Sequence, residues 1–250
     1  MYESKTSKIC VVMPTYNNGG TLRDVVERIL LFCPDVIVVN DGCTDDSADI
    51  LASFGEKITV VDYGTNRGKG YALKQGFKKA KELGYNYAIT IDSDGQHFPE
   101  DIPLFIKTLE QNPDSLIVGS RNLRQENMPG GNTFANKFSN FWFKVQTGVD
   151  LPDTQTGYRL YPLQKMPNLS LLTSRYEAEL ELLVGAAWRG TDLIPIKINV
   201  FYPKAEERVT HFRPFWDFFR ISVLNTFLCI FAIIYGLPSR AIRRARRRHE

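Results

Sequence analysis

Short apolar runs alternate with amphipathic segments along the first half of the chain. The apolar runs lie at residues 8–14, 35–41, 57–63, 85–92 and 114–120, and segments with helical spacing lie between them at 21–32, 45–54, 68–84 and 100–112. Runs such as Val36–Val39 are apolar at every position, as expected of strands covered on both faces. Strands that alternate with amphipathic helices predict βαβ units, so the expected fold class is α/β with a mainly parallel sheet flanked by helices.

The regular alternation fades after residue 121. Gly, Pro and Asn residues predict a loop at 122–132, and the segment 133–148 fits a helix with an aromatic face. A loop and strand at 153–161, a helix at 176–190 and an extended segment at 193–203 follow. The composition suggests no linker before about residue 205, so residues 1–205 are predicted to form one domain.

Polar residues recur where the predicted strands end. They lie at Pro14–Asn18, Asn40–Gly42, Asp92–Gln96 and Gly119–Arg121. Open α/β sheets bind their ligands beyond the carboxyl ends of the strands. The chemistry of this protein is therefore expected at one edge of its sheet.

The strand end at residues 92–96 carries the most informative pattern. Asp92 and Asp94 follow an apolar run, with Gln96 two residues further on. Mg²⁺ and Mn²⁺ bind hard oxygen ligands, often one or two carboxylates together with substrate phosphates. Asp41, at a second strand end, is placed to accept hydrogen bonds from a base or ribose. Together these residues indicate a nucleotide-diphosphate site; the alternative is that Asp92 and Asp94 only cap the turn before the next helix.

Three commoner motifs do not fit the chain. The EF-hand pattern counted from Asp92 fails because His97 and Pro103 stand where Gly and Glu are required. A Walker A loop needs four residues between its glycines, whereas "GTNRGKG" has three. The dinucleotide pattern G-x-G-x-x-G fails because Leu73 replaces its third Gly.

The net charge of +3 is unevenly distributed. Residues 239–250, "SRAIRRARRRHE", hold six Arg and one Glu, and subtracting their +5 leaves −2 for the rest of the chain. The body therefore has no basic surface that would predict a nucleic-acid partner. The four cysteines have neither C-x-x-C pairing nor metal-ligand spacing and indicate reduced cytosolic thiols, and the polar N-terminus predicts no signal peptide.

Six stretches together resemble a known family. "MPTYNN", "VVNDGCTDDS", "NRGKGYALKQG", "DSDGQHFPED", "GSR" and "DTQTGYRLY" appear in the order and approximate spacing of glycosyltransferase family 2. Over about residues 8–205 the chain resembles the dolichyl- or polyprenyl-phosphate mannosyl- and glucosyltransferases of that family. The resemblance implies a GT-A fold, a nucleotide-diphospho-sugar donor, a divalent cation (Mg²⁺ or Mn²⁺) and transfer with inversion at the sugar.

The resemblance also implies roles for residues on the donor side. Nucleotide-sugar binding falls to Pro14, Tyr16, Asn18, Asp41, Gly42, Lys69, Asp92 and Ser93, and metal binding falls to Asp94 and Gln96. Arg121 is assigned to the leaving diphosphate, where a fixed guanidinium stabilises the charge that develops. Asn18 stands where the family usually has an acid, and an amide can hydrogen-bond but carries no charge.

The acceptor side is less defined. The resemblance points to Asp153, Gln155 and Thr156, and His211 and Arg213 are candidates for an acceptor phosphate or a membrane headgroup. A phosphate acceptor is already ionised and needs no base, whereas a hydroxyl acceptor needs one. Glu177, Glu179 or Glu181 could supply that base. Residues two apart on a helix do not share a face, so one of the three is expected in the site, and Glu179 is favoured.

The expected function is a membrane-associated, metal-dependent, inverting transfer of a sugar to a lipid-linked acceptor, most simply polyprenyl phosphate. A hydroxyl acceptor with Glu179 as base is one alternative. A nucleotide-sugar binding module without catalysis is another, for which Asn18 is the only hint. A nucleotidyltransferase is a weaker alternative, because "PTYNNGGT" lacks the Arg expected in the loop after its first strand.

Residues 206–250 are predicted to associate with a membrane. Residues 221–239 hold no charge and approach the ~20 residues of a spanning helix. Nucleotide sugars are cytosolic, and six Arg after this segment also favour the cytosolic side, so one span cannot satisfy both ends. We expect an aromatic interfacial helix at 215–219, a re-entrant or in-plane apolar helix, and an Arg tail on anionic headgroups at the cytoplasmic face. The alternative is an oligomer contact with a disordered basic tail.

Overall fold

The computed structural model describes residues 8–121, 130–166, 173–201 and 214–239. Its strands are β1 (Ile9–Thr15), β2 (Val36–Asn40), β3 (Thr59–Asp62), β4 (Tyr87–Thr90), β5 (Leu116–Arg121), β6 (Arg159–Pro162) and β7 (Leu193–Ile198). Its α-helices are α1 (Gly19–Leu30), α2 (Ser47–Ser53), α3 (Lys69–Glu82), α4 (Ile102–Gln111), α5 (Gly130–Thr147), α6 (Glu177–Arg189) and α7 (Pro214–Phe231). Short turns of 3₁₀ helix lie at Gly55–Lys57, Pro99–Asp101 and Leu163–Lys165, and α7 continues into a π turn at Ala232–Gly236.

These elements follow the predicted order, and their boundaries differ from the predicted ones by a few residues. The loop expected to reach residue 132 ends earlier, because α5 begins at Gly130. Local Gly and Asn preferences are weak and are overridden when a helix packs against its neighbours.

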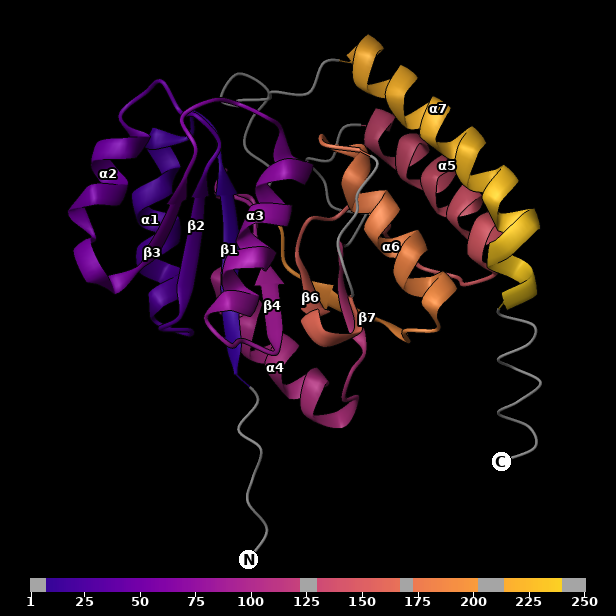
Figure 1. Cartoon of the computed structure of the whole chain (residues 1–250), viewed down its shortest axis with the longest axis horizontal. Helices are drawn as coiled ribbons and strands as arrows, with labels where there is room; N and C mark the ends of the chain where they lie inside the picture. Colours follow the sequence, from indigo (N-terminus) through magenta and orange to yellow (C-terminus); the bar gives the residue numbers. More distant parts are fainter. Residues whose placement is uncertain (1–7, 122–129, 167–172, 202–213, 240–250) are drawn as a thin grey trace, which may run out of the picture.

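Within the described residues the strands form one sheet in the order β3-β2-β1-β4-β6-β5-β7 (Figure 1). Strands β1 to β4 pair in parallel, and β5 and β7 are parallel to each other. Strand β6 lies antiparallel between β4 and β5. The prediction of a mainly parallel α/β sheet is confirmed.

Helices cover both faces of the sheet. Leu22 of α1 and Phe105 of α4 pack on one face with Val11 and Met13 of β1. The other face of β1, with Cys10 and Val12, belongs to a second core that includes Phe77 of α3. The same strand therefore contributes alternate residues to two cores, which explains why its sequence is apolar throughout.

Helices α5, α6 and α7 form a layer on the side of the sheet that also carries α3 (Figure 1). Leu224 and Leu228 of α7 are buried in the second core, so α7 is packed on the body of the protein. Among the described residues, one helical stretch is long and apolar enough to cross a membrane by length and composition, Phe219–Ser239, with a mean hydropathy of 2.0. Within the most apolar 18-residue part of this stretch, 28% is buried in the protein.

Candidate active site

The carboxyl edge of the sheet brings the predicted residues together. Asp41 follows β2, Asp92 lies two residues beyond the end of β4, and Arg121 is the last residue of β5. Because these strands point the same way, their ends meet at one edge. The chain also reverses its direction of winding here, with β2 on one side of β1 and β4 on the other, which is the usual place for a ligand crevice.

A buried ion-pair cluster lies at the end of β4. The Lys69 ammonium, in the first residue of α3, lies 2.7 Å from Asp92 Oδ1 and 3.1 Å from Glu179 Oε1. Burial alone would lower the pKa of Lys69, but the two carboxylates outweigh it and raise the pKa. Burial would likewise raise the pKa of Asp92, yet the Lys69 charge brings it below its usual value. Lys69 of α3 is therefore held by two carboxylates, one after β4 and one on α6.

The three glutamates of α6 have different surroundings. Glu179 contacts Lys69, whereas Glu181 Oε2 accepts hydrogen bonds from the amide and hydroxyl of Thr173. Glu177 is buried, and its Oε2 has no hydrogen-bond partner in the part of the chain described. The structure thus places Glu179, of the three, beside Asp92.

Gly157 lies directly against the ion-pair cluster. A Cβ at this position would fall 2.8 Å from Asp92 Oδ2, 2.8 Å from Lys69 Nζ and 2.9 Å from Glu179 Oε1. The position of Gly157 is fixed by its carbonyl, which accepts a 2.6 Å hydrogen bond from the Thr90 hydroxyl. A side chain here would therefore displace the charged groups, which accounts for the glycine at this position.

Asp94 carries the charge that the cluster leaves uncompensated. Its pKa is raised to about 6 by burial and by the nearby Asp92 charge. Its Oδ1 accepts a 3.0 Å hydrogen bond from the Gln96 amide, so Asp94 also orders the turn, as the alternative interpretation expected.

A divalent cation fits this arrangement. Asp92, Asp94 and Glu179 place three carboxylates against one ammonium, and a cation would relieve the repulsion that raises the pKa of Asp94. Across the described residues, no group of three or more His, Cys, Asp or Glu side chains encloses a metal position. The donor set instead suits a hard cation that takes one or two carboxylates and completes its shell with substrate phosphates and water.

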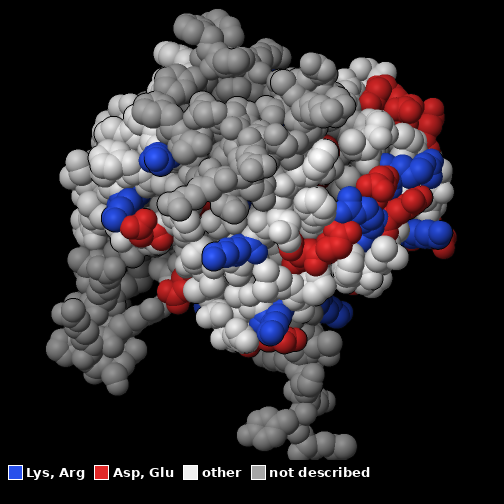
Figure 2. Space-filling view, turned by 180° about the vertical axis from the view of Figure 1, so that it is seen from behind, with Lys and Arg blue, Asp and Glu red and all other residues white. Residues whose placement is uncertain are grey.

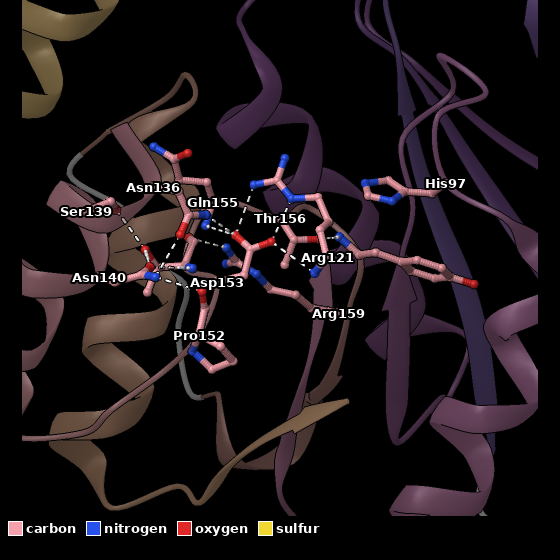
Figure 3. A network of polar contacts seen from close by, with 12 residues as sticks. His97, Arg121, Asn136, Ser139, Asn140, Pro152, Asp153, Gln155, Thr156 and Arg159 are labelled. Carbon is pink, nitrogen blue, oxygen red and sulfur yellow. Dashed lines mark hydrogen bonds and ion pairs between the residues drawn. The ribbon is translucent and has the colours of Figure 1, made fainter. Parts of the chain in front are cut away.

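A second ion pair lies at the end of β5. Arg121 donates from Nε to Asp153 Oδ2 at 2.6 Å and from Nη2 to Oδ1 at 3.0 Å, a two-point contact that fixes the guanidinium plane (Figure 3). The Asn136 amide donates to the same carboxylate at 2.7 Å. Burial would raise the pKa of Asp153, but its hydrogen bond to Arg121 and the charge of that residue lower it. Asp153, predicted on the acceptor side, thus holds Arg121 in place.

The other acceptor-side candidates lie near this pair. The Gln155 amide donates to Asp153 Oδ1 at 3.1 Å, and the Gln155 side chain is exposed. Thr156 is buried, and its hydroxyl accepts from the Tyr158 amide at 3.2 Å. His211 and Arg213 lie outside the described residues.

A chain of polar side chains links the segments that follow β1 and β4. Asn18 donates to the Ser93 hydroxyl at 2.9 Å, and that hydroxyl donates to the Thr15 hydroxyl at 3.1 Å. The Thr21 hydroxyl reaches the Ser93 carbonyl at 2.6 Å. Asn18, where the family usually has an acid, therefore bridges the loops that follow β1 and β4.

Asp41 orders the loop that precedes α3. Its carboxylate accepts hydrogen bonds from the Tyr63 hydroxyl at 2.7 Å and from the amides of Arg67 and Gly68 at 2.7 and 2.9 Å. Gly42 follows with a φ of +71°, and a Cβ there would lie 2.5 Å from backbone atoms of the same loop. These contacts hold the loop at the edge of the sheet beside β2.

Two predicted base-pocket residues flank the end of β1. Pro14 is buried within the strand, and Tyr16 is half-buried directly after it. Their positions at the same sheet edge agree with the expected location of a nucleotide pocket, although their contacts with a base stay predictions.

His97 was missed by the sequence reasoning. It is buried, its ring packs on Tyr158 with centroids 5.3 Å apart, and its Nε2 lies 4.0 Å from Asp92 Oδ2. Burial lowers its pKa to about 4, and the charges of Asp92, Arg121, Lys69 and Asp153 all act on it. His97 therefore lies between the two ion pairs. Its place in "DSDGQH", three residues after Asp94, was the signal that could have found it.

Arg159 was also missed. It is fully buried at the start of β6 and donates to the carbonyls of Glu179 and Thr154 at 2.7 and 3.0 Å. It links the acceptor-side loop to α6, a contact between distant segments that no local pattern indicates.

Residues 10–162 match the family model described as glycosyl transferase family 2. The match covers more than half of the chain, so the protein belongs to glycosyltransferase family 2. The family predicted from the sequence is confirmed.

Three relatives are named as enzymes that attach a sugar to a polyprenyl or dolichyl phosphate. A UDP-N-acetylglucosamine–dolichyl-phosphate N-acetylglucosaminyltransferase of Methanococcus voltae is 29% identical over 78% of this chain and 86% of its own. A polyprenol monophosphomannose synthase of Mycolicibacterium smegmatis is 28% identical over 78% and 77%. An undecaprenyl-phosphate mannosyltransferase of Micrococcus luteus is 29% identical over 62% and 66%.

Solved structures confirm the GT-A fold. Glucosyl-3-phosphoglycerate synthase of Mycobacterium tuberculosis in complex with UDP superposes with a TM-score of 0.64 at 19% identity, over 91% of this chain and 80% of that one. The same enzyme with Mn²⁺, UDP-glucose and phosphoglyceric acid gives 0.63 at 17% identity, over 92% and 79%. At these identities the likeness concerns the fold alone.

Proposed function

We propose that the protein transfers a sugar from a nucleotide-diphospho-sugar to polyprenyl phosphate at the cytoplasmic face of a membrane, with a divalent cation. The observation that carries this proposal is the pair of unlike clusters at one sheet edge. One has three carboxylates against a single ammonium, and the other is an arginine fixed by a buried aspartate. A donor diphosphate needs both a cation and a fixed positive group.

The donor side follows from Asp94 and Arg121. A divalent cation, when bound, would neutralise charge on the diphosphate and is held in this proposal by Asp94 and Gln96. As the bond from the sugar C1 to the diphosphate oxygen breaks, Arg121 stabilises the negative charge that the leaving group gains. Its two hydrogen bonds to Asp153 keep the guanidinium oriented before the reaction, so little reorganisation is needed.

The acceptor side favours a phosphate over a hydroxyl. An acceptor hydroxyl would need Glu179 as general base, but Glu179 Oε1 lies 3.1 Å from the Lys69 ammonium. This oxygen is therefore already occupied by the Lys69 ammonium and is not open to an acceptor hydroxyl. A phosphate oxygen is already ionised and attacks C1 on the face opposite the leaving diphosphate, with inversion. In this proposal Glu179 contributes charge beside Lys69.

The lipid acceptor is supported by the C-terminal helix and by the relatives. Residues 206–250 form the proposed membrane-associated unit, appended to a catalytic domain of residues 1–205. The stretch Phe219–Ser239 is apolar, and the chain ends in six Arg that suit anionic headgroups. Burial of Leu224 and Leu228 against the body supports an in-plane helix over one that leaves the protein to span the bilayer.

The test is transfer from radiolabelled nucleotide sugars to polyprenyl phosphate. A thermal-shift screen of UDP- and GDP-sugars with Mn²⁺ selects the donor, and extraction of labelled lipid measures the product. The expected result is a labelled polyprenyl phosphate sugar, formed only with a divalent cation present.

Two outcomes would contradict the proposal. Labelling of a polyprenol or another hydroxyl acceptor, but not of the phosphate, would favour the Glu179-base alternative. Tight nucleotide-sugar binding without transfer to either acceptor and without donor hydrolysis would indicate a binding module.

A further inference from the structure

Helix α5 buries several polar side chains beside Phe143 and exposes several apolar ones. Asn136, Gln146 and Thr147 are fully buried, whereas Phe141 is 58% exposed and Val145 is 45% exposed. Helices at a water-exposed surface normally show the reverse arrangement, with apolar residues facing the core. The outer face of α5 comprises Phe138, Phe141 and Val145, with the exposed Lys137 and Lys144 beside them. Its apolar part is larger than is usual for a surface in contact with water.

The buried polar face of α5 supports the loop that holds Arg121. Asn136 donates to Asp153, which binds the Arg121 guanidinium at two points (Figure 3). One turn further on, Asn140 donates to the Pro152 carbonyl and accepts from the amide of Thr154. The hydroxyls of Ser139 and Thr154 lie 2.8 Å apart. The helix thus carries Asp153 on one side and an exposed aromatic face on the other.

Helix α7 lies beside α5 (Figure 1). The Gln146 amide of α5 donates to Asn225 Oδ1 of α7 at 2.9 Å, which fixes the two helices together. Outward from this contact, α7 exposes Phe227 at 55% and Ile230 at 50%, and Ile234 in the following π turn is 70% exposed. Two helices therefore present one apolar surface.

Charge identifies the occupant of this surface. The six Arg of residues 240–250 follow α7 directly in the sequence, so a strongly basic segment begins where the apolar helix ends. Figure 2 shows charged side chains on both sides of the molecule, with more of them on the side that carries α1 and α2 than on the side of α5 and α7. Apolar faces beside a basic segment match a bilayer that contains anionic lipids.

We propose that α5 lies in the membrane interface with its outer face in the lipid, and that the same helix positions Arg121 relative to the bilayer through Asn136 and Asp153. The membrane contact stands on the exposed faces of α5 and α7 by themselves. The role of Arg121 rests on the proposed function. Asn136 is in this account a positioning residue, since it acts through Asp153.

The first experiment measures membrane contact of the full chain by flotation with vesicles of phosphatidylcholine and phosphatidylglycerol. The double variant Phe141→Ser/Val145→Ser removes apolar contact from the outer face of α5 and is expected to weaken vesicle binding about tenfold or more. Leu31→Ser is the matched control, because Leu31 is 77% exposed at the end of α1, away from this layer. That control is expected to bind vesicles like the native protein.

Two results would overturn the membrane contact. One is equal vesicle binding by the double variant and the native chain. The other is a change in the mass of the vesicle-free protein, measured by light scattering, from an oligomer in the native chain to a monomer in the double variant. That second result would assign the outer face to a second copy of the chain.

The second experiment tests the link to Arg121 with a short-chain, water-soluble polyprenyl phosphate as acceptor. Vesicles are expected to raise kcat of the native protein severalfold. In Asn136→Leu this stimulation should be lost, while vesicle binding and the Kd for nucleotide with Mn²⁺ stay within about twofold of native. Asn140→Ala provides a second variant in the same helix if Asn136→Leu does not fold.

The link is wrong if either folded variant keeps the native stimulation by vesicles, or if vesicles do not stimulate the native protein. If no acceptor is labelled by the native chain under any condition, the proposed function fails instead. The vesicle-binding comparison would still decide the membrane contact in that case, because it needs no turnover.

Discussion

The two ion-pair clusters at the sheet edge differ in how their charge is balanced. At the end of β4, Lys69 faces the carboxylates of Asp92 and Glu179, and the neighbouring Asp94 has a pKa raised to about 6. At the end of β5, Arg121 and Asp153 neutralise each other in a two-point contact. The first cluster carries excess negative charge in a buried setting, whereas the second is balanced.

The difference shows that one edge of the sheet can carry both a cluster with excess negative charge and a neutral ion pair. An excess of buried carboxylates is costly unless a cation is present, so it suits a site that binds one. A balanced pair suits a group that must keep its position while charge changes nearby. His97, neutral at pH 7 because burial lowers its pKa to about 4, lies between the two and adds no charge of its own.

The largest effect is expected for the unbalanced cluster. Asp94→Asn keeps the shape of the side chain but removes the charge proposed to hold the cation, so kcat/KM should fall by about 10³-fold or more. The fold should survive, because the change relieves repulsion with Asp92. Calorimetry of Mn²⁺-dependent nucleotide binding measures the loss of the cation site, and thermal unfolding measures whether the fold survives. Asp150→Asn is the control, because the Asp150 carboxylate is exposed. If Asp94→Asn turns over at the native rate and still binds nucleotide in a metal-dependent way, Asp94 is not a metal ligand.

The balanced cluster is tested by Arg121→Lys. Lysine keeps the charge but cannot copy the two-point contact with Asp153, so kcat should fall by about 10²-fold with a smaller rise in KM. Asp153→Asn should reproduce part of this loss by releasing the guanidinium. Steady-state kinetics with the donor varied separate the two constants. A change confined to KM would show that Arg121 binds ground state and transition state equally.

Gly157→Ala disturbs the unbalanced cluster without changing any charge. The added Cβ would meet Asp92, Lys69 and Glu179 within 2.9 Å, so we expect about tenfold lower kcat and a lower melting temperature. Gly20→Ala in α1 is the control, because a Cβ there has no neighbour within 4 Å. If Gly157→Ala matches that control in both measurements, the close approach of the loop has no functional consequence.

The smallest effect concerns pH. Because the folded-state pKa of Asp94 is raised to about 6 from a usual 3.8, protonation competes with a cation below pH 6. Mn²⁺ affinity should be constant above pH 7 and fall by up to about tenfold per pH unit below 6. In the cation-free protein, the contribution of this group to stability is fully present below pH 3.8 and is lost as the pH rises through 6. Calorimetric titration from pH 5 to 8 measures the first effect, and Asp94→Asn should remove this dependence.

Much of the site could be predicted because strand ends are local features. An apolar run that stops at Asp92 or Arg121 marks the end of a buried strand, and parallel strands bring such ends to one edge. The family motifs then assigned chemical roles to positions already marked by the pattern. The partners of these residues could not be predicted in the same way. Asp153 lies 32 residues from Arg121 along the chain, and spacing alone does not indicate that the two meet.

Helix α5 marks the limit of sequence patterns most clearly. Its aromatic residues recur at helical spacing, and that period was enough to predict a helix with an aromatic face. Period alone does not state which face is buried. The choice was made by tertiary contacts, because Asn136 and Asn140 find partners in Asp153 and Thr154 and so turn Phe141 outward.

The sequence by itself determined the α/β class, the family and the sheet edge at which the candidate site residues lie, because hydrophobic period and strand-end motifs are properties of short segments. Only the tertiary structure decided that Lys69 is paired with Asp92 and Glu179, that Asp153 holds Arg121, and that α7 packs on the body. Each of these facts joins segments far apart in the chain. Such contacts depend on how the elements pack in space, which the order of residues within any one segment does not specify.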